Sequence, residues 1–322
     1  MNTHPEPGEA ARAAVLRGWG FVLPESLLRF QDFLHSLSPE AARTLADLGL
    51  SPAGIMDVVA DPDRAPRPGI DIRVHGRYYR DPPEFLTFLH GGSDGLHYGL
   101  WFDDGRTAAG TASYYTNDGG GIAYDPTGTP LTAVRDVLER VWRDLHDDDP
   151  ADPDVVRRLA ALAELRTLIC RFETSDRPEQ GLAYSGTYDP GFLRRPLSPD
   201  RLTTLDGAGA LVTGATILDR PPHNGADEYH FAEHLYARLD EPATVTAWVA
   251  EARARCSSGD PAEALALGRD LHWASGGDAT LEAHAHDLLT LAYTALDRPH
   301  LAALTTAHHT HRDLPGVDVL AG

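Results

Sequence analysis

The hydrophobic pattern changes its period along the chain, and this change limits the fold more than any other feature. Between residues 70 and 124, short segments alternate apolar and polar side chains, and turn-forming residues separate them. Such a pattern is typical of an antiparallel sheet. From Tyr236 onward, apolar residues recur every three or four positions, as in amphipathic helices. Strands followed by a long helical region predict the α+β class, with a mostly antiparallel sheet first and an all-helical part after it.

Local signals assign individual segments. Proline before or at the first turn predicts helix starts, and the glycine-rich sequence NDGGG predicts a hairpin at 117–121. We expect strands at 70–79, 96–102, 111–115 and 122–124. We expect helices at 9–18, 26–37, 39–48, 132–145, 154–172, 240–255, 261–272, 278–296 and 298–310.

An acidic run that contains two prolines, at 146–153, marks the best candidate for a boundary. We therefore divide the chain into a polar tail over 1–14, an α+β module over 15–146, a connector over 147–225 and a helical module over 226–322. The stretch 173–225 is rich in Gly, Pro and Asp, and it allows no assignment of elements.

Charge and composition exclude several kinds of protein. The 322 residues carry a net charge of −20 and include no lysine, so all 28 basic residues are arginines. This charge repels phosphate backbones and predicts no nucleic-acid partner. A Schiff base and a P-loop lysine are excluded. No apolar run reaches the roughly 18 residues that span a bilayer, and the first residues do not resemble a signal peptide, so we expect a cytoplasmic protein without a membrane partner.

The sequence contains only weak motifs for catalysis, metal binding or NAD binding by this chain alone. Asp103 and Asp104 follow a predicted strand, where paired carboxylates bind a cation, act as acid and base, or simply begin a turn, and we favour the turn. Two pairs of histidines share a helical face, but neither stands in a zinc motif, so we expect no metal. These pairs are His308 with His311 and His230 with His234. No glycine-rich fingerprint for NAD follows a strand.

Three segments in the same order and spacing resemble the histone PARylation factor family. Trp19–Val58 is similar to the family's "GF-LPE" helix and "LGL" segment, and Tyr79–Asp104 to its "DPPEF" turn and following strand. Glu263–Arg312 is similar to its terminal helices, with ALALGRDL in the place of "GLELGxDL". The match is weak across about 150–225. The motif residues of the second segment are Asp81, Pro82, Pro83, Glu84, Phe85, His97, Tyr98, Trp101, Asp103 and Asp104.

The resemblance implies both a fold and a function. Animal members bind the catalytic domain of nuclear poly(ADP-ribose) polymerases and add an acidic residue to a joint active site, which directs ADP-ribose to serine. The N-terminal half of the family's proteins resembles the fold of the SUKH superfamily, which includes bacterial toxin-immunity proteins. We therefore expect a SUKH-like α+β module and an ADP-ribosyltransferase partner. We expect no cofactor on this chain alone, with NAD entering only through the partner.

The family's catalytic residues carry over only in part. Its Asp-Glu pair falls on Ser257 and Ser258, and serine is no carboxylate base. The nearest carboxylates are Asp260 and Glu263, which become the candidates for the joint active site.

The family's partner-binding Tyr-Arg pair carries over in part as well. Its tyrosine falls on Tyr236, and the next position is Ala237, with Arg238 one residue on. We assign Tyr236 and Arg238 to partner binding.

Two functions stay open. The first is an accessory protein that docks on an ADP-ribosyltransferase and modulates or completes its active site. The second is a SUKH-type immunity module that binds a toxin without a catalytic role, which the negative charge also suits. We expect no ADP-ribosyl transfer by the chain alone. We also expect Phe85 and Tyr98 in the core beneath the Asp-Pro-Pro turn, with Trp101 at least partly buried.

Overall fold

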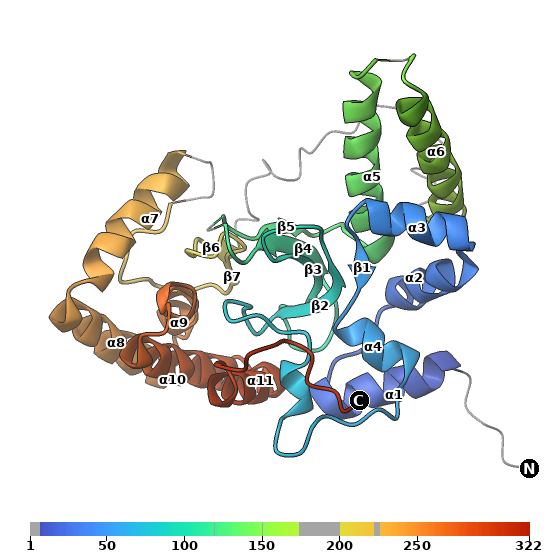
Figure 1. Cartoon of the computed structure of the whole chain (residues 1–322). Coiled ribbons are helices and arrows are strands. Elements are labelled where there is room, and N and C mark those ends of the chain that lie inside the picture. Colours follow the sequence, from blue (N-terminus) through green and yellow to red (C-terminus); the bar gives the residue numbers. More distant parts are fainter. Residues whose placement is uncertain (1–6, 119, 150, 174–199, 222–225) are drawn as a thin grey trace, which may run out of the picture.

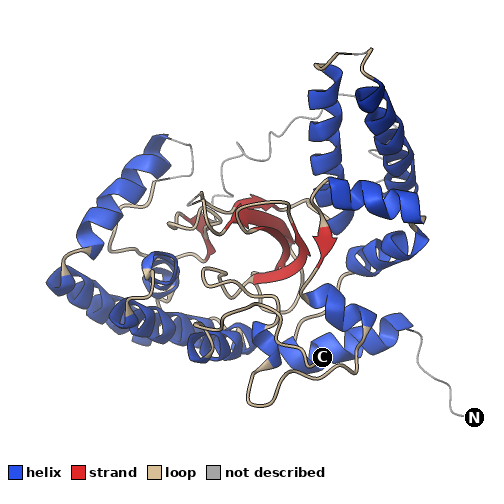
Figure 2. Ribbon diagram, in the orientation of Figure 1, coloured by secondary structure: helices blue, strands red, loops and turns tan. Residues whose placement is uncertain are grey.

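The computed structural model describes residues 7–118, 120–149, 151–173, 200–221 and 226–322. A five-stranded antiparallel sheet in the order β1-β2-β3-β4-β5 lies at its centre, with helices around it (Figures 1 and 2). The strands are β1 (Ser51–Pro52), β2 (Phe85–His90), β3 (Leu96–Trp101), β4 (Gly110–Tyr115) and β5 (Ala123–Asp125). This sheet, followed by a helical C-terminal region, confirms the α+β class.

The two central strands are buried on both faces. Strand β2 pairs with β3 from Phe85↔Trp101 to His90↔His97, with an irregularity between Thr87 and Leu89. The first five residues of β2 are all buried, so its sequence FLTFLH shows no alternation of apolar and polar residues. The strand was missed in the sequence for this reason.

Six helices precede or flank the sheet in the first half of the chain (blue to green in Figure 1). Phe30 and Phe33 from the second of them and Phe88 from β2 are fully buried in the main core. The last helix of the set packs against the second, third and fifth. The helices are α1 (Pro7–Trp19), α2 (Glu25–Ser36), α3 (Pro39–Asp47), α4 (Ile55–Ala60), α5 (Pro130–His146) and α6 (Pro153–Glu173).

The second half forms a layer of helices on the other side of the sheet (orange to red in Figure 1). Helix α9 is buried along almost its whole length and packs against α8 and α10. A two-stranded ribbon of β6 (Arg201–Leu202) and β7 (Ala210–Leu211) precedes these helices. The helices are α7 (Ala226–Leu239), α8 (Pro242–Ser257), α9 (Ala262–Ala274), α10 (Ala279–Ala295) and α11 (Pro299–Thr310). No helix within the described ranges has the length and apolar character of a bilayer span.

An aromatic cluster joins the sheet to this helical layer. Phe85 and Trp101 are fully buried and meet edge to face, with ring centroids 6.5 Å apart. Tyr114 of β4 contacts Trp273 of α9, with centroids 5.2 Å apart. The predicted burial of Phe85 and Trp101 is confirmed, and Tyr98 is half-buried against the main core.

Two expectations differ from the structure. Residues 70–79 form no strand but a 3-10 turn, Ile72–Val74, because the Asp71 side chain accepts a hydrogen bond from the Arg73 N–H and caps the turn. Helix α1 begins at Pro7, inside the segment taken as a polar tail, and Ala11 on it is fully buried. The resemblance to the SUKH superfamily stays a prediction.

Candidate functional site

The loop between α8 and α9 carries the positions of the family's catalytic acids. Ser257 ends α8 and Ser258 follows it, and both are exposed. Asp260 is half-buried, and its carboxylate accepts hydrogen bonds from the N–H of Ala215 at 3.1 Å and of Ala262 at 3.4 Å. Asp260 therefore lies at the surface of this loop and fixes the start of α9.

Glu263 takes a different place from Asp260. Its side chain is fully buried and accepts from the Arg220 guanidinium at 3.0 Å and from the Ile217 N–H at 2.7 Å. Arg220 also bonds Asp270 at 2.8 Å. A carboxylate held in this way has no access to solvent in this structure, and the assignment of Glu263 to a joint active site stays a prediction. Arg220 lies in the stretch without periodic pattern, where nothing in the sequence marked it.

Burial has a larger effect on the pKa of Asp270 than its ion pair with Arg220 has. Asp270 is fully buried, and desolvation raises its pKa to about 6, although Arg220 acts in the opposite direction. The Arg220–Glu263–Asp270 group thus ties the segment 217–220 to helix α9.

Tyr236 and Arg238 lie at the end of α7. Tyr236 is 46% exposed and borders a cavity of about 390 Å³ between α7, α8 and α10. Arg238 is exposed and pairs with Glu241 at 3.0 Å. Helix α8 separates Tyr236 from the Asp260 loop, and its 16 residues span about 24 Å at 1.5 Å per residue. The structure therefore presents two candidate surfaces that are well apart.

The DPPEF turn holds a buried polar network rather than an open site. The Asp81 carboxylate accepts from Tyr114 OH at 2.5 Å and lies 2.8 Å from His97 Nε2. Arg77 donates to the carbonyl oxygens of Asp81, Pro82 and Phe85. Because all these partners belong to the turn and its neighbouring strands, the network fixes the turn in place.

Glu84 of the same turn connects the sheet to the helical layer. Its carboxylate accepts from Tyr293 OH at 2.8 Å and lies 3.2 Å from Arg269. Arg269 also pairs with Asp206 at 2.6 Å. All four side chains are nearly inaccessible. The most specific motif of the sequence thus has a structural role in joining the two halves of the chain.

Asp103 and Asp104 are also engaged within the protein. Asp103 accepts from Trp101 Nε1 at 2.8 Å and pairs with Arg201. Asp104 accepts from the N–H groups of Arg106 and Thr107, at 2.7 and 2.6 Å, as the first residue of a turn does. Both of the carboxylate oxygens of Asp103 are engaged, whereas Asp104 is exposed and accepts both bonds on one oxygen.

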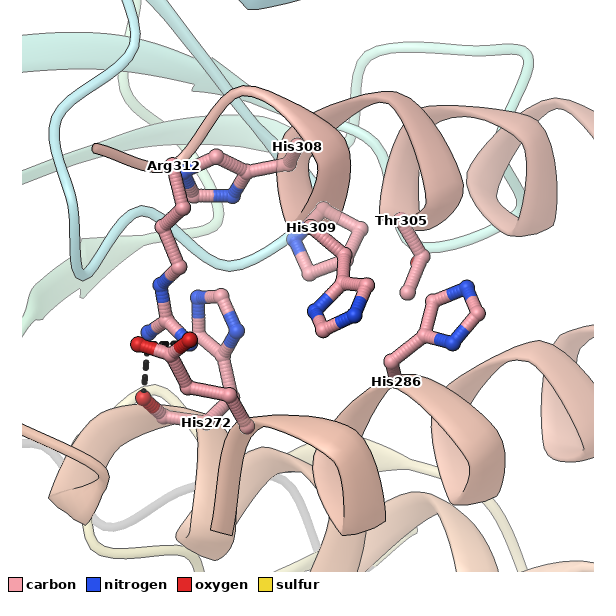
Figure 3. A pocket seen from close by; sticks show the side chains of 8 residues that line it. His272, His286, Thr305, His308, His309 and Arg312 are labelled. Atoms are coloured by element: carbon pink, nitrogen blue, oxygen red, sulfur yellow. Dashed lines mark hydrogen bonds and ion pairs between the residues drawn. The ribbon is translucent and has the colours of Figure 1, made fainter. Parts of the chain in front are cut away.

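Histidines from three helices meet around a small pocket (Figure 3). His272 comes from α9, His286 from α10, and His308 and His309 from α11. The pocket measures about 10 Å³, room for about one water. Over the described ranges, no group of three or more potential metal-ligating side chains occurs, and His230 and His234 are not part of such a group.

Known proteins resemble this chain over part or nearly all of its length. The profile of the family described as Histone PARylation factor 1 matches residues 10–168. The protein named Histone PARylation factor 1 from Bos taurus is 26% identical over 340 aligned positions, which cover 98% of this chain and 90% of the relative. Shorter matches occur to the proteins of the same name from Danio rerio and Mus musculus. They are 29% and 33% identical over 99 and 86 residues, which are 28% and 25% of those relatives.

The matched regions coincide with the features described above. Residues 10–168 include the sheet and the DPPEF turn, and the match to the Bos taurus protein extends over the helical layer as well. The chain is therefore similar to histone PARylation factors over both the sheet and the helical layer.

Proposed function

We propose that this chain is an accessory protein that docks on the catalytic domain of an ADP-ribosyltransferase and modulates its active site. The similarity over 98% of the chain to a protein named for histone PARylation carries this proposal. Two accessible surfaces support it, one at Tyr236 on α7 and one at the loop with Ser258 and Asp260. A net charge of −20 favours association with a basic surface of the partner.

Asp260 is the residue that we propose to complete the joint active site. It is the one carboxylate of the 256–263 loop with solvent access, since Glu263 is fully buried. Its carboxylate accepts hydrogen bonds from two backbone N–H groups, which fix its position in the loop. A charged carboxylate next to a substrate hydroxyl can accept its proton, which is the chemistry of a general base. NAD would enter through the transferase.

The test combines this chain with an ADP-ribosyltransferase catalytic domain encoded by the same organism. We expect a stable complex and a change in the amount or the residue type of protein ADP-ribosylation when the chain is added. Asp260→Asn removes the base at nearly constant shape and should lower this effect by about 10²-fold or more, the range for loss of a general base. Glu40→Gln, on the exposed face of α3, is the matched control and should leave the effect unchanged.

Binding and chemistry can be separated in the same assay. Tyr236→Ala should weaken the complex, while Asp260→Asn should leave binding intact. Loss at Tyr236 with no effect at Asp260 would support docking without completion of the active site. Tight inhibition of the transferase would favour an immunity-type protein instead. Absence of any complex, or consumption of NAD by the chain alone, would overturn the proposal.

A further inference from the structure

The cavity beside Tyr236 is large enough to receive a whole side chain. Its volume of about 390 Å³ falls within the roughly 300–1,000 Å³ of pockets for small organic ligands. Helices α7, α8 and α10 (Figure 1) contribute most of its wall, and Ala274 at the end of α9 completes it. The function proposed above uses Tyr236 for docking and leaves open which chemical group of a partner enters the cavity.

Part of the wall is apolar. Leu239 at the end of α7, Val245 on α8 and Leu281 on α10 line the cavity. Val245 is buried, and the two leucines are half-buried. Apolar surface next to polar groups suits a long side chain with methylene groups and a polar end, because the methylene groups pack while the end stays solvated or paired.

Two carboxylates add negative charge to the wall. Asp240 and Asp278 both line the cavity, and both are exposed. Asp278 accepts from the N–H groups of Thr280 and Leu281 at 2.8 and 3.0 Å, but only with Oδ1, so its other oxygen is not used by this cap. Asp240 forms no hydrogen bond or ion pair with a residue that the structure describes. The wall therefore keeps accessible carboxylate oxygens for a ligand, and its one base is His284.

Tyr236 adds an aromatic ring beside these carboxylates. Its side chain is 46% exposed, and Asp240 follows it by four residues, about one helical turn. A guanidinium stacks on aromatic rings and pairs with carboxylates, whereas an ammonium is a compact and strongly hydrated point charge. A ring next to a free carboxylate therefore favours an arginine side chain over a lysine.

Two arginines of the chain lie near the cavity without lining it. Arg238 is already held in an ion pair of 3.0 Å on the surface of α7. Arg80 lies over the ring of Trp273, 5.5 Å from its centroid. Burial raises the pKa of Tyr236, and Arg80 lowers it by a smaller amount. Neither arginine pairs with a carboxylate of the wall, so these carboxylates lack a guanidinium partner within the described ranges.

We propose that this cavity receives the side chain of an arginine from the transferase. The methylene groups pack against the apolar wall, and the guanidinium lies against Tyr236 and pairs with Asp240 and with the second oxygen of Asp278. Hydrogen bonds between a guanidinium and a carboxylate are the strong kind in proteins, and arginines in central pockets are frequent hot spots of interfaces. The inference rests on the proposed function, since the arginine belongs to the docked partner.

The first measurement needs no partner. The full chain is titrated with N-acetyl-arginine amide and with the corresponding citrulline compound, in which a neutral urea group replaces the guanidinium at nearly the same shape. NMR follows the backbone amide signals. We expect saturable shifts around Tyr236 and Asp240 with the arginine compound, weakened by added salt because the attraction is between charges. The citrulline compound should bind at least about tenfold more weakly.

The second measurement is the affinity of the complex with the transferase catalytic domain. Asp240→Asn removes the charge at nearly constant shape and should weaken the complex about tenfold with an unchanged melting temperature. Asp240→Lys reverses the charge and should weaken it further. Asp32→Asn and Asp32→Lys are the matched controls on an exposed position of α2, on the other side of the sheet (Figure 1). They should leave the affinity within about twofold, as expected for a distant charge beyond the screening length.

The outcomes separate this inference from the function on which it rests. No complex with the wild-type chain overturns the proposed function and the inference together. A complex that is as strong or stronger with Asp240→Lys overturns the inference alone, because the group in the cavity is then not a cation. No preference of the free chain for the arginine compound over the citrulline compound also overturns the inference alone.

Discussion

At the residue scale, the buried carboxylates contribute more to the free energy of unfolding than the exposed ones. Glu263 and Arg220 form a pair inside the protein, and removal of Glu263 leaves the buried charge of Arg220 with Asp270 alone and the Ile217 N–H without its acceptor. We expect Glu263→Ala to lower the free energy of unfolding by about 3–5 kcal/mol. Asp260→Ala loses hydrogen bonds near the surface and should lower it by about 1 kcal/mol. Urea unfolding measures both, and equal effects would show that the buried pair is not formed.

Trp101 is the second residue whose role is set by burial. Its side chain is fully buried between Phe85 and Tyr124, and Arg269 lies over its ring. We expect Trp101→Ala to lower the free energy of unfolding by about 3–5 kcal/mol because of the cavity left behind. Tyr229→Ala is the matched control, since Tyr229 is 68% exposed on α7, and it should change stability by less than about 0.5 kcal/mol. An unchanged stability of Trp101→Ala would mean that the ring is not in the core.

At the element scale, strand β3 depends on a glycine opposite an aromatic ring. A Cβ atom on Gly99 would lie 2.5 Å from the Phe85 ring, so the ring or the strand would have to shift. We expect Gly99→Ala to lower the free energy of unfolding by about 1–3 kcal/mol, as in overpacked cores. Gly120→Ala in the turn before β5 meets nothing within 4 Å and should be nearly neutral. Equal unfolding midpoints of the two variants would contradict the close packing of β2 on β3.

The exposure of each element helps to decide whether it could be predicted from the sequence. The helices α8, α10 and α11 and strand β4 were predicted because one face of each is at least partly exposed, which gives a period. Helix α9 and strand β3 were predicted as well, although they are almost fully buried. Strand β2 has no polar face, and residues 70–79 alternate in sequence but include a turn that Asp71 caps. For the candidate site, Asp260 was chosen because it lies near the family's acid positions, and this choice stays a prediction. The burial of Glu263 depends on Arg220, 43 residues away in the chain. Long-range pairs of this kind leave no periodic pattern.

At the scale of the whole molecule, the histidines between sheet and helices make stability depend on pH. Burial lowers the pKa of His272 and His308 well below 6.5, and Arg312 and Arg77 lower it further. Below the unfolded pKa of about 6.5, the unfolded chain binds protons that the folded chain does not, so stability is lost as pH falls through this value. The buried Asp270, with a pKa of about 6, acts in the opposite direction below pH 6.

A variant isolates the histidine effect. Between pH 7 and 5.5, His308→Gln should make the loss of unfolding free energy smaller by about 1 kcal/mol, since one proton uptake by the unfolded chain disappears. His35→Gln changes an exposed histidine on α2 and should leave the pH dependence as it is. Chemical unfolding at several pH values measures the difference. A steeper dependence in His308→Gln than in the wild type would mean that the folded protein protonates His308 readily.

The segment 317–321 pairs with residues near the sheet that come far earlier in the chain. Arg64 donates to the carbonyl of Ala321, 257 positions away, and the N–H groups of Arg67 and Gly76 donate to Val319 and Val317. During synthesis, residues 64–76 therefore leave the ribosome long before their partners exist. Contacts of such long separation slow folding and lengthen the time for which partly folded chains are exposed. Residues 64–76 should therefore take their final positions only after translation has passed residue 321, and until then the N–H groups of Arg67 and Gly76 lack their partners.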